Sequence, residues 1–237
     1  MSSDHIVILG GSSGIGLATA RRLRDAGHRV TIAGRDPQRL AAAKQSLGDV
    51  AAHALDAADP ARVRAFFQGA GAIDHLVLAF GSRCGVGPFA SVSLDDVRKG
   101  FEEKVFPQFS CAQAALPTLC KDGSLTFLSA ISAQGAAPGT AGIGAANAAI
   151  AALTPILAAE LKPLRVNCVS PGVIDTPWWD FLSPEQKAPA FASFAARTPA
   201  GRVGQADDVA KAIAFLIEDD YMSGQTIICD GGLLRAA

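Results

Sequence analysis

Glycines placed between an apolar run and a helical pattern predict a phosphate-binding turn near the start of the chain. Residues 6–9 are all apolar, and Gly10, Gly14 and Gly16 follow them. Glycine lets the backbone approach a phosphate closely, and the helix beyond offers unpaired N–H groups and a positive dipole end. An ordinary tight turn is the alternative. The place of this turn, between the first strand and the first helix, favours binding of a dinucleotide pyrophosphate.

The composition narrows the class of protein. The chain has 237 residues, 49% of them hydrophobic and 18% charged, which suits one α/β domain over residues 1–237. A net charge of −1 argues against nucleic-acid or anionic-membrane partners. The five cysteines contain no C-x-x-C pair and indicate neither a disulfide framework nor a metal site. We find no signal segment or apolar stretch of membrane-spanning length in the sequence, and we expect a cytoplasmic protein without a membrane partner.

Apolar runs alternate with helical patterns along the whole chain. We expect strands at residues 6–9, 29–33, 50–55, 75–79, 124–129, 164–169 and 226–229. We expect helices at 17–26, 38–47, 61–68, 94–119, 142–161 and from 206 onward, with Pro107 and Pro155 inside two of them. This alternation predicts a Rossmann-type, doubly wound parallel sheet of six to seven strands, with helices on both faces.

The glycine spacing G-x-x-x-G-x-G resembles that of the short-chain dehydrogenase/reductase family. Leu9 departs from the threonine that is usual there, and the glycines are intact. The resemblance extends from about residue 6 to residue 232 and implies a nicotinamide cofactor held by the turn. The turn residues that would hold it are Gly10, Ser12, Ser13, Gly14, Ile15 and Gly16.

The end of the second strand bears on the choice of cofactor. Gly34 and Arg35 stand where relatives that prefer NAD carry an acidic residue for the ribose hydroxyl. An arginine without that acid favours NADP(H), and a solvated loop charge is the alternative. Asp56 matches the aspartate that binds the adenine amino group in the family. The alternative role for Asp56, as a helix N-cap, falls more naturally to Asp59.

Two further segments match the nicotinamide side of the family's site. The family shows N-N-A-G after its fourth strand, and of these four residues only Gly81 is present at positions 78–81. Residues 170–177 match the segment P-G-x-x-x-T, in which Ile174 and Thr176 would hold the nicotinamide carboxamide. The resemblance therefore adds Gly81, Pro171, Gly172, Ile174 and Thr176 to the cofactor-binding residues.

The four catalytic positions of the family all depart from its pattern. The segment 139–149 aligns without gaps and places Ile143 at the tyrosine and Asn147 at the lysine. Ala130 takes the place of the serine, and Lys104 that of the asparagine. A positioned general acid or base contributes about 10² to 10⁴ in rate. An isoleucine at the proton donor therefore predicts the loss of most ordinary carbonyl reduction.

Asparagine and lysine have changed places between positions 104 and 147, which face one another in the family. One hypothesis is that the Lys104 ammonium fills the space of the missing lysine, near the ribose or a substrate oxygen. Burial would lower its pKa and make it a proton donor. Ser129 and Ser132 are further candidates, and Asn147 remains a cofactor-binding residue. Drift at a site without catalytic demand is the alternative.

A segment rich in aromatic residues follows, and we expect a substrate-covering loop at about 178–200. Its aromatic residues are Trp178, Trp179, Phe181, Phe191 and Phe194. They line an apolar pocket in one interpretation and form ordinary core in the other. The first interpretation implies a small-molecule ligand that is apolar or aromatic.

These observations lead to two hypotheses about function. One is an NADP(H)-dependent oxidoreductase that acts on a carbonyl or alcohol through an altered site. The other is a non-redox member: a nucleotide-binding regulator, an inactive partner subunit, or a catalyst of elimination or cyclisation. The resemblance also implies a homodimer or homotetramer, packed through the alanine-rich residues 145–159. Pairing with a catalytically complete relative is the alternative.

Overall fold

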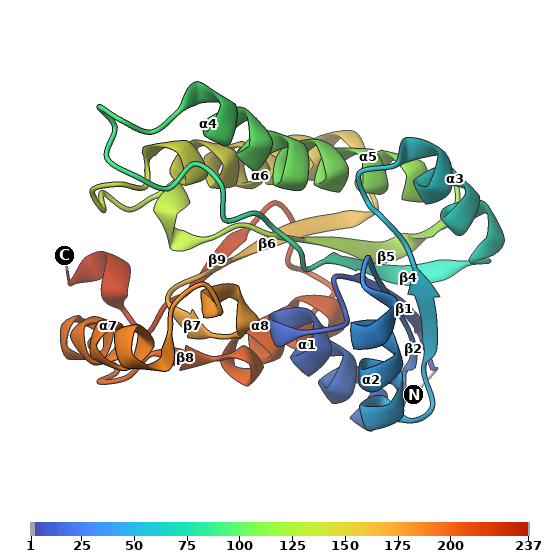
Figure 1. The fold of residues 1–237 in the computed structure, drawn as a ribbon. Helices are drawn as coiled ribbons and strands as arrows, with labels where there is room; N and C mark the ends of the chain where they lie inside the picture. The colour runs from blue at the N-terminus through green and yellow to red at the C-terminus, as the bar shows by residue number, and fades with distance from the viewer. Residues whose placement is uncertain (1–2, 237) are drawn as a thin grey trace.

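The computed structural model describes residues 3–236, so residues 1, 2 and 237 of the predicted domain lie outside the described part. One seven-stranded parallel sheet organises the chain, in the order β3-β2-β1-β4-β5-β6-β9 (Figure 1). Its strands are β1 His5–Leu9, β2 Arg29–Gly34, β3 Ala51–Ala54, β4 Ile73–Leu78, β5 Leu119–Leu128, β6 Arg165–Pro171 and β9 Thr226–Cys229. Two short strands, β7 Ile174–Asp175 and β8 Gly204–Gln205, pair separately.

Helices cover both faces of this sheet. They are α1 Gly14–Asp25, α2 Pro37–Leu47, α3 Pro60–Gly69, α4 Leu94–Gly100, α5 Phe106–Ala115, α6 Ala141–Glu160, α7 Pro184–Arg197 and α8 Ala206–Glu218. In Figure 1, α3, α4, α5 and α6 lie above the sheet, and α1, α2 and α8 lie below it. The predicted doubly wound α/β fold is confirmed.

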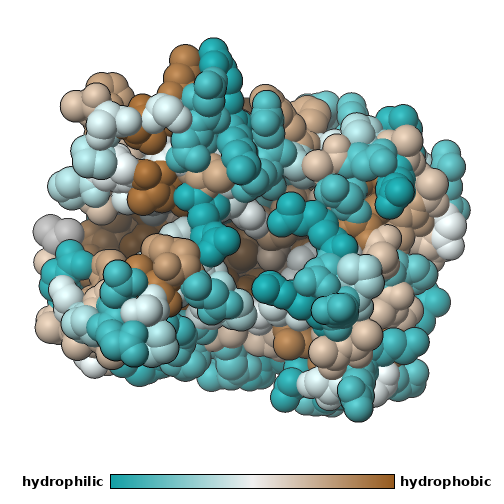
Figure 2. Space-filling model, in the orientation of Figure 1, coloured by the Kyte–Doolittle hydropathy of each residue, from teal (hydrophilic) through white to brown (hydrophobic). Residues whose placement is uncertain are grey.

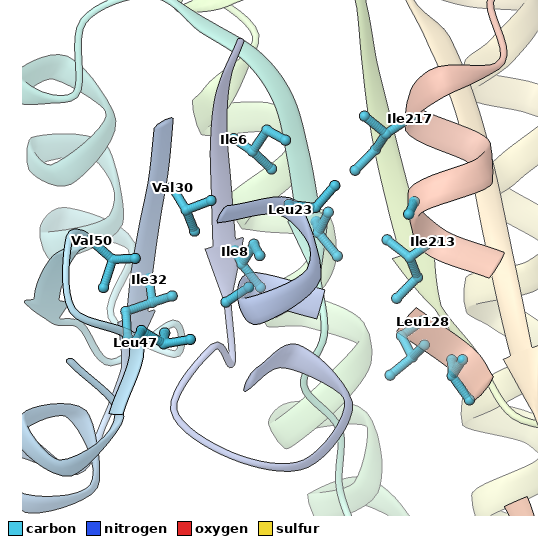
Figure 3. Close-up of a cluster of buried hydrophobic side chains, with 14 of the residues drawn as sticks. Ile6, Ile8, Leu23, Val30, Ile32, Leu47, Val50, Leu128, Ile213 and Ile217 are labelled. Atoms are coloured by element: carbon cyan, nitrogen blue, oxygen red, sulfur yellow. The ribbon is translucent and has the colours of Figure 1, made fainter. Parts of the chain in front are cut away.

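Two buried hydrophobic clusters hold the layers together. The cluster in Figure 3 joins the sheet to α1 and α8 through Ile6, Ile8, Leu23, Ile213 and Ile217. The second cluster lies on the opposite face, and among its side chains Phe67 and Phe127 are fully buried. Strands buried on both faces are apolar along their whole length, which explains why the sequence shows continuous apolar runs.

The helix predicted at 94–119 forms with a π-helical turn inside it and ends earlier than predicted. The chain forms α4, then a π-helical turn at Phe101–Val105, then α5, which ends at Ala115. Pro107 has no N–H to donate to a preceding carbonyl, and the wider turn accommodates the break, with the Phe106 N–H donating to the Phe101 carbonyl. The strand predicted at 124–129 begins earlier, at Leu119.

The loop predicted at 178–200 is largely helical. A short 3₁₀ turn at Pro177–Trp179 leads to α7, which occupies Pro184–Arg197. Ser183 and Gln186 form a capping box at its start, and Pro189 lies within it. Proline and closely spaced aromatic residues obscure the helical pattern in the sequence, which explains the error.

The expectation that no apolar stretch reaches membrane-spanning length is also wrong. Helix α6 has 20 residues and a mean hydropathy of 1.6, enough to cross a membrane by length and composition alone. In this fold α6 packs on β6 as part of one helical layer (Figure 1). Within that apolar window 28% of the residues are buried, and the others are partly or fully exposed, among them Ile156.

Candidate functional site

A hollow opens between the two helical layers, with apolar surface in its depth and polar residues at its rim (Figure 2). The corresponding cavity has a volume of about 720 Å³ and lies at the carboxyl ends of the parallel strands. The order of the strands reverses between β1 and β4 at this edge. Such a switch point is where open α/β sheets bind their ligands. We refer to this cavity as the pocket.

The glycine turn forms one wall of the pocket and leaves the start of α1 open. Gly10 has φ +83°, and a Cβ there would lie 2.6 Å from the Ala79 carbonyl oxygen. A Cβ on Gly16 would lie 2.2 Å from the Gly10 oxygen, so this glycine lets the helix pack against the turn. Ser13 precedes α1 without capping it through its side chain. The first N–H groups of α1 are therefore available to an anion, which fits a dinucleotide phosphate.

The far end of the pocket carries the side chains that bear on the choice of cofactor. Arg35, Asp36 and Arg39 lie there with Asp56. Asp36 accepts hydrogen bonds from the N–H groups of Gln38 and Arg39 and so caps α2, which occupies this carboxylate. The Arg35 guanidinium is exposed at the same edge.

Asp56 and Asp59 have the two roles weighed from the sequence. Asp59 accepts from the N–H groups of Ala61 and Arg62 and is the N-cap of α3, as predicted. Asp56 accepts from the Ala58 N–H at 3.0 Å, and its exposed carboxylate lines the pocket.

The structure brings nearly all the residues of the predicted cofactor site into one place. Gly16 is the exception: it supports the turn from behind. The predicted residues that line the pocket are Gly10, Ser12, Ser13, Gly14, Ile15, Arg35, Asp56, Gly81, Asn147, Pro171, Gly172, Ile174 and Thr176. The segment 170–177 closes over the glycine turn, since a Cβ on Gly14 would lie 3.4 Å from the Thr176 Cβ.

The four divergent positions also meet in this pocket. Ile143 and Asn147 lie one turn apart on α6, Ala130 follows β5, and Lys104 projects from the π-helical turn. The Lys104 ammonium donates to the Asn147 amide oxygen and, at 3.3 Å, to the Ser129 carbonyl. Burial lowers the pKa of Lys104 to about 8. The exchanged pair is thus in direct contact.

The two candidate serines differ in what their hydroxyls contact. Ser129 is buried, and its hydroxyl donates to the Asn147 carbonyl at 2.8 Å, which occupies its proton. Ser132 accepts a hydrogen bond from the Asn147 side-chain nitrogen at 2.9 Å, so its own proton remains to be donated. Lys104 and Ser132 are therefore the two predicted candidates that can donate into the pocket. Tyr221, the one tyrosine in the chain, is 95% exposed and does not line the pocket.

The aromatic residues combine both interpretations made from the sequence. Trp179 contacts Trp178, Phe181, Phe191 and Phe194 at ring-centroid distances of 4.7 to 5.9 Å, so the rings form a small core of their own. All of these side chains except Phe191 also line the pocket. They give it one apolar wall.

The segment after β4 faces this wall and was not predicted from the sequence as part of the site. Ser82 donates to the Glu103 carboxylate at 2.6 Å, and its carbonyl accepts from the Trp178 indole N–H at 3.3 Å. Arg83 lies over the Phe181 ring at 5.7 Å. A short polar stretch after a strand gives no signal that its partners lie about 20 and 96 residues further along the chain.

Comparison with known proteins agrees with this geometry. Residues 10–234 match the family model described as enoyl-(acyl carrier protein) reductase. The chain belongs to the short-chain dehydrogenase/reductase family. The predicted family membership is confirmed, and the match includes both the glycine turn and the segment 170–177.

Relatives of this family cover almost the entire chain. The 4-formylbenzenesulfonate dehydrogenase of Comamonas testosteroni is 32% identical over 98% of this chain and 98% of its own. A small-chain dehydrogenase solved in complex with NADPH has a TM-score of 0.87 and 31% identity, covering 99% of this chain and 100% of its own. A reductase/Diels–Alderase from Malbranchea aurantiaca has a TM-score of 0.90 and 25% identity, covering 98% and 97%.

Proposed function

We propose that the protein binds NADP(H) in the pocket and acts on a carbonyl or alcohol substrate through an altered catalytic site. The observation that carries the proposal is the open N-terminus of α1 beside glycines that have no room for a side chain. The NADPH complex of a relative with the same fold supports it. When bound, the cofactor would supply or accept a hydride.

The preference for NADP(H) over NAD(H) rests on the far end of the pocket. Arg35 is exposed there and can pair with a ribose phosphate. The carboxylate closest to it in sequence, Asp36, is occupied as the cap of α2. A phosphate would thus meet a free guanidinium and an acid that is already hydrogen-bonded.

Lys104 and Ser132 would take over the roles of the missing tyrosine and serine. The Ser132 hydroxyl can donate to a substrate oxygen because the Asn147 amide supplies the bond that it accepts. The Lys104 ammonium can then give a proton to that oxygen, with a pKa of about 8 that suits proton transfer near neutral pH. The aromatic wall of Trp178, Trp179 and Phe181 would hold an apolar or aromatic part of the substrate.

A titration of the purified protein, freed of copurified nucleotide, with NADPH and separately with NADH tests the cofactor assignment. We expect micromolar binding of NADPH, clearly tighter than that of NADH. Arg35→Ala should remove most of this difference, and Arg62→Ala, an exposed arginine outside the pocket, should not. The absence of binding by either nucleotide would overturn the proposal.

A second function has its own supporting observation. Ile143 and Ala130 place apolar groups at the positions that the resemblance assigns to the tyrosine and the serine. A structural neighbour described as a reductase/Diels–Alderase is consistent with non-redox chemistry on this fold. A nucleotide-binding regulator or an elimination or cyclisation catalyst would bind NADPH without consuming it across a broad panel of carbonyl compounds. Consumption that Gly14→Trp abolishes would favour the oxidoreductase.

The uncovered side of α5 and α6 suits self-association. Phe106 and Phe109 of α5 and Ile156 of α6 are large exposed hydrophobic residues, with 61%, 47% and 58% of their surface accessible. Alanines along α6 would allow a second helix to approach closely. We favour a second copy of this chain as the partner, in a homodimer or homotetramer. A catalytically complete relative as the partner, and a cytoplasmic location, also remain proposals.

A further inference from the structure

Lys104 brings a buried positive charge to the pocket without a carboxylate partner. Only 6% of the residue is exposed, and the other charged residues that line the pocket are more accessible. In residues 3–236 its ammonium donates to two neutral acceptors, the Asn147 amide and the Ser129 carbonyl, and forms no ion pair. Peptide and amide dipoles therefore balance the charge only in part.

The acidic side chains beside Lys104 turn away from it. Glu103 accepts from Ser82, lies 3.9 Å from the Lys99 ammonium and contacts the Cys84 sulfur. Glu102 is exposed to solvent. No carboxylate of the described chain thus offsets the charge of Lys104 within the pocket.

The elements packed against Lys104 bring thiols and neutral groups. Cys168 on β6 is the titratable side chain that acts on Lys104, and burial raises the pKa of this thiol to about 11. Burial raises the pKa of Cys111 on α5 to about 12. Helix α6 presents the neutral Asn147. Between pH 7 and pH 9, Lys104 is therefore the group that changes charge within the described surroundings.

The place of Lys104 follows from the strand order. The glycine turn follows β1, and Gly81 and Ser129, which flank Lys104, follow β4 and β5. A dinucleotide with its phosphates on α1 and its adenine toward Asp56 must continue across the ends of β4 and β5. A Cβ on Gly81 would lie 3.4 Å from the Lys104 nitrogen, so a glycine here leaves that side of the ammonium uncovered.

We propose that Lys104 makes the pocket discriminate between the two oxidation states of the nucleotide, binding NADPH in preference to NADP⁺. This inference rests on the proposed function and deepens it. The oxidised nicotinamide ring carries a positive charge that the buried ammonium repels, whereas the reduced ring is neutral. By linkage, loss of the Lys104 proton relieves the repulsion, so the preference weakens as the pH rises. Where turnover is slow, the fraction of the protein that is occupied by NADPH then depends on the ratio of NADPH to NADP⁺ in solution.

Calorimetric titration with NADPH and with NADP⁺ at pH 7 and pH 9 tests this preference. Both nucleotides carry the same ribose phosphate, so its ionisation cancels in the ratio of their dissociation constants. We expect NADPH to bind about tenfold more tightly than NADP⁺ at pH 7, the size of a unit-charge repulsion in a partly buried site. At pH 9, above the pKa of Lys104, the ammonium is about one-tenth protonated and the ratio should fall close to one.

Two matched variants assign the effect to this residue. Lys104→Gln removes the charge but keeps an N–H donor for Asn147, and should give the smaller ratio at both pH values. Lys99→Gln removes an exposed ammonium one turn earlier and should behave as the parent protein does. Thermal melts monitored by circular dichroism establish that each variant folds. If Lys104→Gln does not fold, the pH series of the parent protein decides alone.

The outcomes separate this inference from the proposed function. NADPH binding with a ratio that stays within twofold between pH 7 and pH 9 would overturn the inference and leave the NADP(H) site standing. A pH-dependent ratio that Lys104→Gln retains would also overturn it. The absence of binding by both nucleotides would overturn the proposed function, and the inference with it.

Discussion

The Lys104 ammonium and the Asn147 amide form a buried hydrogen bond across the floor of the pocket, between helical segments 43 residues apart in sequence. The same amide donates to Ser132, so one asparagine positions both groups that can donate into the pocket. A lysine at position 104 with an asparagine at position 147 thus makes a coupled unit. The geometry favours this interpretation over independent drift at two positions.

Asn147→Asp tests this coupling. A carboxylate at the place of the amide oxygen would put an opposite charge beside the Lys104 ammonium, and should raise the pKa of Lys104 from about 8 by one to three units. An NMR titration of the Lys104 Cε signal measures the change. Ser132→Ala, which keeps the amide, should leave that pKa within about half a unit. An unchanged pKa in Asn147→Asp would contradict the coupling.

The glycine turn predicts different stability effects at two of its glycines. A Cβ on Gly16 would lie 2.2 Å from the Gly10 oxygen, so Gly16→Ala should lower the free energy of unfolding by more than about 2 kcal/mol. Gly14 has φ +51° but more room, and Gly14→Ala should cost about 1 kcal/mol. Urea denaturation compares the two variants. Equal losses would mean that crowding behind the turn does not determine its shape.

The fold, and the grouping of the residues assigned to the cofactor around one pocket, could be predicted because their sequence signals are local. The local backbone of the turn requires glycine at positions 10, 14 and 16, and burial on both faces requires apolar residues along the strands. The resemblance then placed Arg35 and Asp56, which the structure brings to one end of the pocket. The predicted bounds of most strands and helices differ from the observed bounds by a few residues, because the sequence pattern is weakest at the ends of an element.

The catalytic half resisted prediction because its geometry depends on contacts between distant segments. The π-helical turn that directs Lys104 inward depends on Pro107, which the sequence marks only as a break. The contact of Trp178 with Ser82 joins residues 96 positions apart. Ser132 keeps its own proton for donation because the Asn147 side chain donates to its hydroxyl oxygen. The spacing of residues in the sequence does not predict this orientation of Asn147.

Two buried histidines predict acid sensitivity at the opposite end of the sheet. Burial is the largest cause that lowers the pKa of His5 and of His75 below 6.5; Asp74 opposes it at both histidines, and Asp4 opposes it at His75. Below about pH 6.5 these two histidines bind protons in the unfolded chain, whereas burial keeps them neutral in the folded protein. The free energy of unfolding should therefore fall as the pH drops from 7.5 to 5.5.

Urea denaturation over that pH range measures this slope. His75→Gln should reduce the slope of the unfolding free energy against pH, because it removes one histidine whose pKa is lower in the folded state than in the unfolded chain. His53 is exposed, and His53→Gln should leave the slope unchanged. A slope that is the same in the parent and in His75→Gln would contradict this assignment.

The exposed apolar face of α5 and α6 predicts an oligomer that one charge can disrupt. Ile156→Glu would bury a carboxylate in any interface formed there, and should shift the mass in solution toward that of the monomer. Light scattering coupled to gel filtration measures the mass. Phe89→Glu alters an exposed residue in the segment between β4 and α4 and serves as the control. A parent protein that is monomeric at micromolar concentration would contradict the proposed self-association.

Restoring the family's catalytic residues should restore ordinary reduction, but only if the exchange at position 104 is reversed as well. Asn147→Lys alone would place a second ammonium where Lys104 already lies within hydrogen-bonding distance, and two like charges in a buried site destabilise each other. Ile143→Tyr with Asn147→Lys should therefore fold poorly and remain inactive. Adding Lys104→Asn and Ala130→Ser removes the clash and completes the set.

This fourfold variant should consume NADPH with aromatic aldehydes at least about 10²-fold faster than the parent, the contribution of one positioned general acid. Loss of NADPH absorbance measures the rate, and NADPH binding by calorimetry shows whether the cofactor half is intact. A variant that binds NADPH but stays inactive would mean that the pocket has also lost the geometry for hydride transfer. That result would favour the non-redox function, because the divergence would then extend beyond the four exchanged side chains.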